Sequence, residues 1–149
     1  MRISKKARKE NKKIVLTNGC YDLFHVGHIS SLKEARKYGD ILIVGLNSDS
    51  SVKKWKDESR PIIKEKQRAR LLLPYVDYVY IFSGYSPMNV LKAIKPEVYV
   101  KGGDYKRDTE DKGNCRKYIR SYGGKVIIVP LVRNISTSKI IKKICKKYQ

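Results

Sequence analysis

Short apolar runs and amphipathic segments alternate along the whole chain. Five of the apolar runs are rich in Val, Ile and other β-formers, and polar residues do not alternate regularly within them. Runs of this kind are typical of strands in a parallel sheet whose two faces are both covered. The predicted strands lie in residues 12–19, 40–49, 77–82, 97–104 and 125–132.

The segments between these strands have the spacing of helices. In the clearest case, residues 114–124, apolar side chains recur at i, i+3, i+4 and i+7. Ser86 and Pro87 predict the start of another helix, with Ser86 as its N-cap and Pro87 at the first helical position. Further helices are predicted after the first strand up to Gly39, and in residues 65–76, 86–96 and 136–148. The polar segment 50–62 is predicted to be a loop.

Five strands that alternate with helices predict an α/β protein, with a Rossmann-like five-stranded parallel sheet and helices on both faces. A length of 149 residues suits one compact domain. We expect residues 1–149 to form a single domain, in which residues 1–13 are a basic, solvated N-terminal arm. The arm lacks the apolar segment of a signal peptide.

The composition of the chain argues against several classes of protein. No run approaches the roughly 18 apolar residues of a membrane span, so a membrane is not an expected partner. The three cysteines, Cys20, Cys115 and Cys145, are odd in number and far apart. That spacing predicts neither a disulfide framework nor a zinc site. Buried or half-buried free thiols in a reducing cytoplasm are expected instead.

The net charge of +20 indicates an affinity for anions. A basic surface can bind nucleic acid, anionic lipid or a phosphorylated small molecule. The lysines are spread along the chain, and neither zinc-finger spacing nor an RNA-recognition aromatic motif is present. Nucleic acid is therefore not the partner that the sequence favours.

Four polar stretches follow predicted strands, at residues 17–28, 47–56, 101–108 and 133–138. Ligands of such sheets bind at the carboxyl ends of the strands, near the switch in strand order. We therefore expect these four stretches to converge on one site.

The first stretch contains both histidines of the chain. His25 and His28 are three residues apart at the start of a predicted helix, so they would project from neighbouring positions. Gly27 leaves room for an incoming phosphate, which the helix N-terminus also favours. Two imidazoles there could stabilise charge that develops on a phosphate under attack.

"GCYDLFHVGH" resembles the HxGH signature of the nucleotidyltransferase superfamily that includes the cytidylyltransferases. The resemblance runs from about residue 14 to residue 144, with "VGLNSDSSV", "RPI", "KGGDY" and "ISTS" in family order. Among members, the motifs look most like the adenylyltransferases that act on heptose 1-phosphate. The resemblance implies transfer of a nucleoside monophosphate from a nucleoside triphosphate to a small phosphorylated acceptor, with Mg²⁺ and release of pyrophosphate. It also implies a homodimer, and the unpaired cysteines predict a cytoplasmic location.

The resemblance assigns roles residue by residue. The implied catalytic residues are His25, His28, Lys56 and Arg133, with Lys53 and Lys54 as rivals of Lys56. The implied nucleotide-binding residues are Thr17, Asn18, Gly19, Gly27, Asp104, Ser136, Thr137 and Ser138. The implied substrate-binding residues are Asp22, Asp49 and Arg68. No protein metal site is implied.

Three alternatives stay open at the level of sequence. "RNISTS" looks as much like the closing motif of glycerol-3-phosphate cytidylyltransferases, which would use CTP and a polyol phosphate. An adenylyltransferase like the FAD synthases is the second alternative. The third is a non-enzymatic, basic nucleic-acid-binding protein, which the intact motifs disfavour. Trp55 stands where the heptose enzymes carry an aliphatic residue.

Overall fold

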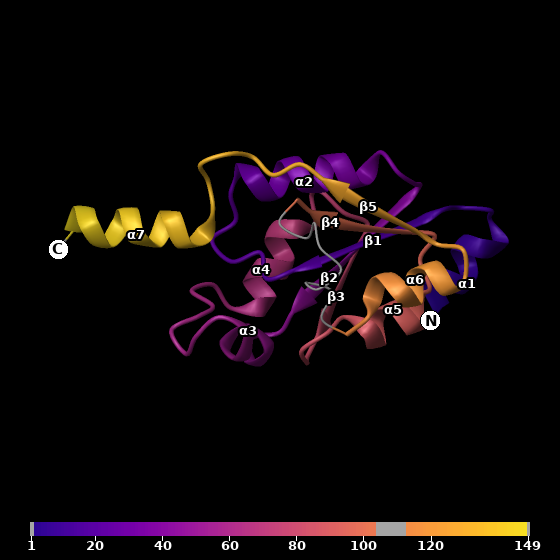
Figure 1. Ribbon diagram of the computed structural model, residues 1–149, viewed down its shortest axis with the longest axis horizontal. Helices are drawn as coiled ribbons and strands as arrows, with labels where there is room; N and C mark the ends of the chain where they lie inside the picture. Colours follow the sequence, from indigo (N-terminus) through magenta and orange to yellow (C-terminus); the bar gives the residue numbers. More distant parts are fainter. Residues whose placement is uncertain (1, 104–112, 149) are drawn as a thin grey trace.

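The computed structural model describes residues 2–103 and 113–148, and its centre is a parallel sheet of five strands. The strands are β1 (Ile14–Gly19), β2 (Ile41–Asn47), β3 (Tyr78–Phe82), β4 (Val98–Gly102) and β5 (Lys125–Val129). Their order in the sheet is β3-β2-β1-β4-β5, and every pairing is parallel (Figure 1). The predicted fold class is confirmed.

Helices cover both faces of this sheet (Figure 1). They are α1 (Arg2–Lys9), α2 (Val26–Arg36), α3 (Asp49–Trp55), α4 (Glu65–Leu72), α5 (Met88–Ile94), α6 (Cys115–Ser121) and α7 (Thr137–Tyr148). One apolar cluster joins one face of the sheet to side chains of α2 and α4. A second cluster joins the other face to α1, α5 and α6. The central strands are buried on both sides, which explains why their sequences lack alternation.

The basic N-terminal segment differs from the prediction. Residues 2–9 form helix α1 instead of a solvated arm, and the side chains of Ser4 and Ala7 are each only 1% exposed. The guanidinium of Arg8 donates hydrogen bonds to the carbonyls of Ile94 and Lys95, at 2.8 and 2.9 Å. These carbonyls lie at the C-terminal end of α5, where carbonyl groups have no hydrogen-bond donor within the helix. The segment is therefore ordered by contacts with residues far away in the sequence.

The segment 50–62 was predicted to be a loop, but most of its first half forms helix α3. Ser48 caps this helix by accepting a hydrogen bond from the Ser51 amide at 3.2 Å. Ser51 and Val52 are buried, whereas the lysines of the helix face solvent. A helix of seven residues with a single buried aliphatic side chain leaves too weak a pattern to predict. The start of α5 is also shifted: Pro87 is the N-cap, and Ser86 Oγ accepts from the Met88 amide.

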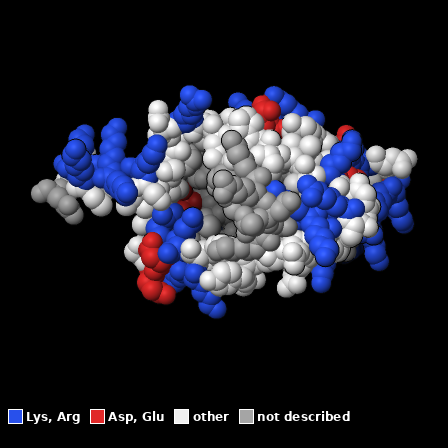
Figure 2. Space-filling view, viewed as in Figure 1, with Lys and Arg blue, Asp and Glu red and all other residues white. Residues whose placement is uncertain are grey.

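The last helix, α7, projects away from the rest of the molecule (Figure 1). None of its residues is buried, and the exposed fractions of Ile144 and Tyr148 are 50% and 76%. Lys and Arg gather over α7 and over the opposite end of the molecule, and acidic side chains are few on this face (Figure 2). In the described part of the chain, no helix has the length and apolar content needed to cross a membrane.

The three thiols are free but differ in burial. Cys115 is buried and Cys20 is half-buried, as predicted, whereas Cys145 on α7 is exposed. The prediction was wrong for Cys145, which lies on α7, a helix without buried residues.

Candidate active site

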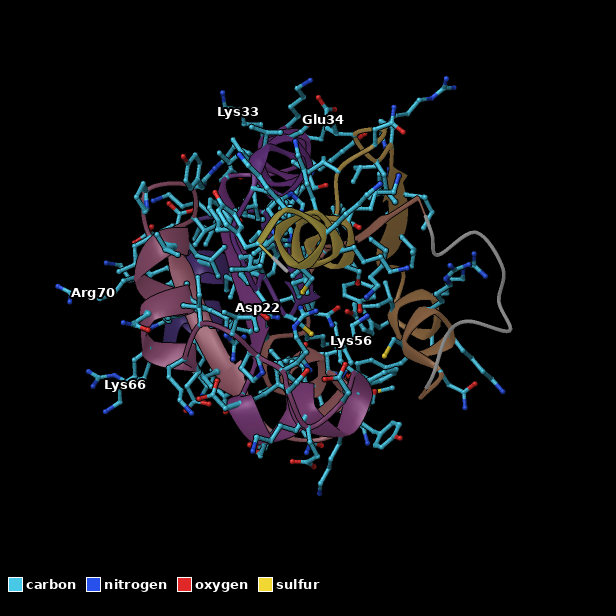
Figure 3. The ribbon with its side chains drawn as sticks, turned by 90° about the vertical axis from the view of Figure 1, so that its left-hand side faces the viewer. Asp22, Lys33, Glu34, Lys56, Lys66 and Arg70 are labelled. Carbon is cyan, nitrogen blue, oxygen red and sulfur yellow. The ribbon has the colours of Figure 1, made fainter. Side chains whose placement is uncertain are left out.

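A cavity of about 450 Å³ opens at the carboxyl ends of the strands. Chain order switches here, because β1 is followed in the sequence by β2 and β3 on one side, while β4 and β5 lie on the other. All four polar stretches predicted from the sequence contribute lining residues. Figure 3 looks towards this end of the molecule, with Asp22 and Lys56 near its centre and Lys33, Lys66 and Arg70 pointing outward.

The two histidines lie against each other at the start of α2. Their rings are stacked, with centroids 3.8 Å apart and planes inclined by 18°, and both line the cavity. His25 is the N-cap of α2, and its Nδ1 accepts a hydrogen bond from the Gly27 amide at 3.1 Å. His28 Nδ1 accepts from the His25 amide at 3.3 Å. The pair thus forms a capping box in which imidazoles replace the usual Ser or Thr and Glu.

This capping box fixes the tautomer of both rings. A neutral imidazole has one donor nitrogen and one acceptor nitrogen. Because Nδ1 of each ring accepts from a backbone amide, Nε2 carries the proton in both His25 and His28. Each histidine therefore keeps an N–H donor on the ring edge away from the helix backbone.

Both imidazoles are neutral at physiological pH. Burial lowers the pKa of His25. Burial and the neighbouring His25 together lower the pKa of His28 to about 4, against a smaller opposing influence of Asp22. The pair can stabilise anionic oxygens through its N–H dipoles, without the additional proton and positive charge of an imidazolium.

Gly27 is required by the close packing of this site. A Cβ atom at residue 27 would lie 3.0 Å from the ring of His25 and 3.3 Å from Ile135. A side chain here would therefore displace either the capping imidazole or the segment that leads into α7. At Gly19, an added Cβ would come to 3.1 Å from the ring of Tyr21.

Asp22 lies in the cavity wall but is already saturated with donors. Its carboxylate accepts from Arg60 Nε at 2.6 Å and from the amides of Ile62 and Ile63, each at 2.9 Å. Burial alone would raise the pKa of Asp22, but these hydrogen bonds and the Arg60 charge outweigh it and lower the pKa. Asp22 thereby holds the segment 60–63 against the loop after β1, which makes it a positioning residue.

Arg68 and Asp49 lie behind the cavity wall and do not line it. The Arg68 side chain is 0% exposed, and it donates to the carbonyls of Cys20, Asn47 and Ile63 and to Asp49 Oδ1. Asp49 Oδ1 also accepts from the Glu65 amide at 2.9 Å. These contacts join the loops after β1 and β2 to the start of α4. Both residues therefore have a structural role, and their contact with substrate stays a prediction.

Among the three candidate lysines, only Lys56 lines the cavity. Lys53 Nζ is instead 3.5 Å from the Glu58 carboxylate at the surface. Arg133 is exposed and is not part of the lining, although its neighbours Val132 and Ile135 are. The structure thus brings Lys56 into the same cavity as the histidines and leaves Arg133 outside its lining.

The predicted Ser/Thr run reaches the cavity at the start of α7. Ser136, Thr137 and Ser138 all line it. Thr137 Oγ1 donates to the carbonyl of Asp22 at 2.6 Å, and Ser136 Oγ accepts from the Lys139 amide at 3.3 Å. The first turn of α7 is therefore tied to the loop after β1, beside the N-terminus of α2.

The remaining predicted residues lie near the strand ends. Asn18 lines the cavity, and its Oδ1 accepts from Tyr99 Oη at 2.6 Å and from Lys101 Nζ at 3.0 Å. Thr17 is buried and lines a smaller adjoining cavity of about 140 Å³. Asp104 lies outside the described residues.

The family model described as cytidylyltransferase-like matches residues 16–143 of this chain. The chain belongs to the cytidylyltransferase-like family. The resemblance noted in the sequence is thereby confirmed at family level.

Individual relatives agree with this assignment. The chain is 46% identical to the "Bifunctional protein HldE" of Geobacter sulfurreducens over 95% of its own length and 48% identical to that of Geobacter metallireducens over 97%. It spans 29% of the length of each of these relatives. A crystal structure titled "lipopolysaccharide core biosynthesis protein", from Thermoplasma volcanium, is 30% identical, with a TM-score of 0.63. The match covers 83% of this chain and 99% of that one.

Within this cytidylyltransferase-like site, several lining residues were not predicted from the sequence. Trp55, Arg60, Tyr85 and Tyr99 line the cavity, and none of them was assigned a role from the sequence. Trp55 ends α3, Arg60 and Tyr85 lie in the loops after α3 and β3, and Tyr99 lies in β4. In the described residues, no group of three or more His, Cys, Asp and Glu side chains could hold a metal ion.

The buried Asp22–Arg60 pair predicts a large loss of stability in Asp22→Asn. The change leaves the Arg60 guanidinium buried without its charge partner, so the free energy of unfolding should fall by about 3 kcal/mol. Urea denaturation measures this value. The control is Glu34→Gln, which removes an exposed ion pair with Lys37 and should cost less than about 0.5 kcal/mol. Equal losses in the two variants would contradict the role of Asp22.

The lowered pKa of His28 predicts a specific pH dependence of stability. Between its unfolded value of 6.5 and its folded value of about 4, the unfolded chain binds more protons. The free energy of unfolding should therefore decrease as the pH falls through this window. In His28→Gln, which can keep the capping hydrogen bond, the slope between pH 6 and 4.5 should be smaller by about 1.4 kcal/mol per pH unit. Denaturation curves with the same slope in both proteins would exclude a buried neutral His28.

Proposed function

We propose that this protein is a nucleotidyltransferase that joins a nucleoside monophosphate to a sugar phosphate and releases pyrophosphate. The observation that carries the proposal is the stacked histidine pair, with both Nε2–H groups available at a helix N-terminus that lines the cavity. Hydrogen-bond donors in this position suit the anionic oxygens of a phosphate group. Membership of the cytidylyltransferase-like family supports the same reaction class.

The residues fit a reaction without a general base. An oxygen of the acceptor phosphate attacks the α-phosphorus of the nucleotide, and the bond from that phosphorus to the β-phosphate oxygen breaks. The electron pair of that bond leaves with pyrophosphate. A phosphate monoester is mostly dianionic at pH 7, since its second pKa is about 6. The acceptor therefore needs no proton removed, which agrees with two histidines that are neutral and hydrogen-bonded through Nδ1.

In this proposal His25 and His28 contact the phosphate under attack, and Lys56 neutralises charge on the reacting phosphates. Ser136, Thr137 and Ser138 hold triphosphate oxygens through their hydroxyls and the amides of the first turn of α7. Asp22, Asp49 and Arg68 keep these groups in place without touching the substrates. Positioning and charge stabilisation thus account for the catalysis.

We propose that Mg²⁺ enters with the nucleotide. Among the described residues that line the cavity, Asp22 supplies the carboxylate, and it is occupied by protein donors and is 1% exposed. Mg²⁺ is commonly held by substrate phosphates and water with few protein ligands. When bound, it would neutralise charge on the triphosphate.

The proposed substrates are ATP and heptose 1-phosphate, which would give ADP-heptose. The "KGGDY" segment and the identity to the HldE proteins support this choice. The "RNISTS" segment keeps CTP with glycerol 3-phosphate as the second candidate, but triphosphate oxygens are common to all nucleotides. A cytoplasmic homodimer remains part of the proposal, supported by the family resemblance and, for the compartment, by three free cysteines.

Replacement of either imidazole should reduce turnover strongly. His25→Asn keeps an N-cap acceptor and His28→Gln keeps the capping-box acceptor, so both variants should fold. Each should lower kcat by about 10²–10³, the scale for loss of one oxyanion donor. The KM for ATP should change less, because the interaction strengthens as charge develops. Pyrophosphate release measures both constants, and full turnover in a folded variant would remove that histidine from the mechanism.

The choice of base gives a direct test of the substrates. With Mg²⁺ and heptose 1-phosphate, ATP should release pyrophosphate at least about tenfold faster than CTP, since a wrong base leaves buried groups unpaired at about 1–3 kcal/mol each. A panel of triphosphates and acceptors measures this preference. If CTP with glycerol 3-phosphate is the best pair, the heptose assignment is wrong and the cytidylyltransferase alternative replaces it.

A further inference from the structure

Two aromatic side chains meet in the cavity wall without belonging to any phosphate-binding motif. Trp55 ends α3, and Tyr85 lies between β3 and α5. Their ring centroids are 4.9 Å apart, with planes inclined by 39°, and both rings line the cavity. Tyr85 is 60% exposed, so it adds little to the core, and its ring is available to a ligand.

The position of this pair follows from the strand order. The histidines lie at the start of α2, which follows the central strand β1. Trp55, Lys56 and Tyr85 follow β2 and β3 on one side of that strand. The lining residues Gly102, which ends β4, and Leu131, which follows β5, lie on the other side. The cavity therefore has two halves that meet at the histidine pair.

Two substrates must meet at the same phosphorus, so each half suits one of them. Residues 101–103, the described part of the "KGGDY" segment that resembles the nucleoside-binding segment of the family, lie at the end of β4 and belong to the β4 and β5 half. The acceptor is thereby left with the β2 and β3 half. This half combines an aromatic surface with the ammonium of Lys56, and this combination suits a phosphorylated sugar.

We propose that Trp55 and Tyr85 form the acceptor subsite and select acceptors that present a ring. The negative face of an aromatic ring attracts the polarised C–H groups on one face of a sugar, and the contact excludes water. Lys56, next to Trp55 in the chain, contacts the acceptor phosphate. An acyclic polyol phosphate has the same phosphate but no ring face. The subsite rests on the proposed function and specifies its acceptor.

Trp55 is the only tryptophan of the chain, so its fluorescence reports on this half of the cavity. Titration of the wild-type protein with heptose 1-phosphate should change the emission in a saturable manner. Inorganic phosphate, which lacks a ring, and ATP with Mg²⁺, which belongs in the other half, should leave it nearly unchanged. A response to ATP with Mg²⁺ and none to the sugar phosphate would overturn the assignment and place the nucleotide at Trp55.

Steady-state kinetics test the same subsite through specificity. Trp55→Leu keeps an apolar side chain but removes the ring, and Tyr85→Ala removes the second ring. Each should raise the KM for heptose 1-phosphate about tenfold, while kcat and the KM for ATP stay within about threefold. The Trp55→Phe and Tyr85→Phe variants should retain most of the affinity. Tyr148→Leu, at the far end of α7, is the control and should behave as wild type.

The ratio of kcat/KM for heptose 1-phosphate to that for glycerol 3-phosphate gives the sharpest readout. It should fall about tenfold in Trp55→Leu, because only the cyclic acceptor loses a contact. A merely structural role would lower both values together. Wild-type turnover tests the proposed function separately: its absence with every sugar phosphate would overturn both proposals. Turnover with an unchanged ratio in the variants would overturn the subsite alone.

Discussion

The arrangement of the site depends on the interactions of the buried Asp22 carboxylate. A buried anion is tolerated only where hydrogen bonds and an opposite charge replace water. Asp22 meets that requirement with the Arg60 guanidinium and the amides of Ile62 and Ile63. Because these donors come from a segment some forty residues away, satisfying the charge also fixes the loop after β1. The carbonyl of Asp22 then receives Thr137 and fixes the start of α7.

The histidine pair combines a structural requirement with a chemical one. A helix N-terminus needs acceptors for its free amides, and phosphate chemistry needs donors aimed at oxygen. An imidazole is able to accept at Nδ1 and donate at Nε2 at the same time, whereas a serine or glutamate cap would leave no fixed N–H donor. Spacing by three residues lets His25 and His28 each cap the other's turn. This reciprocity explains why the only two imidazoles of the chain lie together.

The sequence predicts those helices and strands that are determined by the pattern of neighbouring residues. It does not predict features that are determined by contacts between segments far apart in the chain. The strands and the longer helices follow from apolar runs, and the HxGH stretch is recognisable by its residues alone. In contrast, α1 is ordered by Arg8 at the end of α5, and the burial of Arg68 arises from carbonyls on two different loops. An arginine in a phosphate-binding family is expected to contact phosphate. The residues around Arg68 in the sequence do not indicate that its guanidinium donates to backbone carbonyls instead. Arg133 is the opposite case: its neighbours line the cavity, whereas its own side chain is exposed and does not line it.

The large positive charge acts mainly at a distance from the site. Three described lining residues are basic, and two of them have partners: Arg60 is paired with Asp22, and Lys101 donates to Asn18. Lys56 is the exposed one. Most of the net charge of +20 therefore lies on outer surfaces such as α7 (Figure 2). Charges so placed raise the encounter rate with anionic substrates but are screened over about 8 Å at physiological salt. Within the cavity, neutral donors in fixed positions must supply the stabilisation that distant lysines cannot.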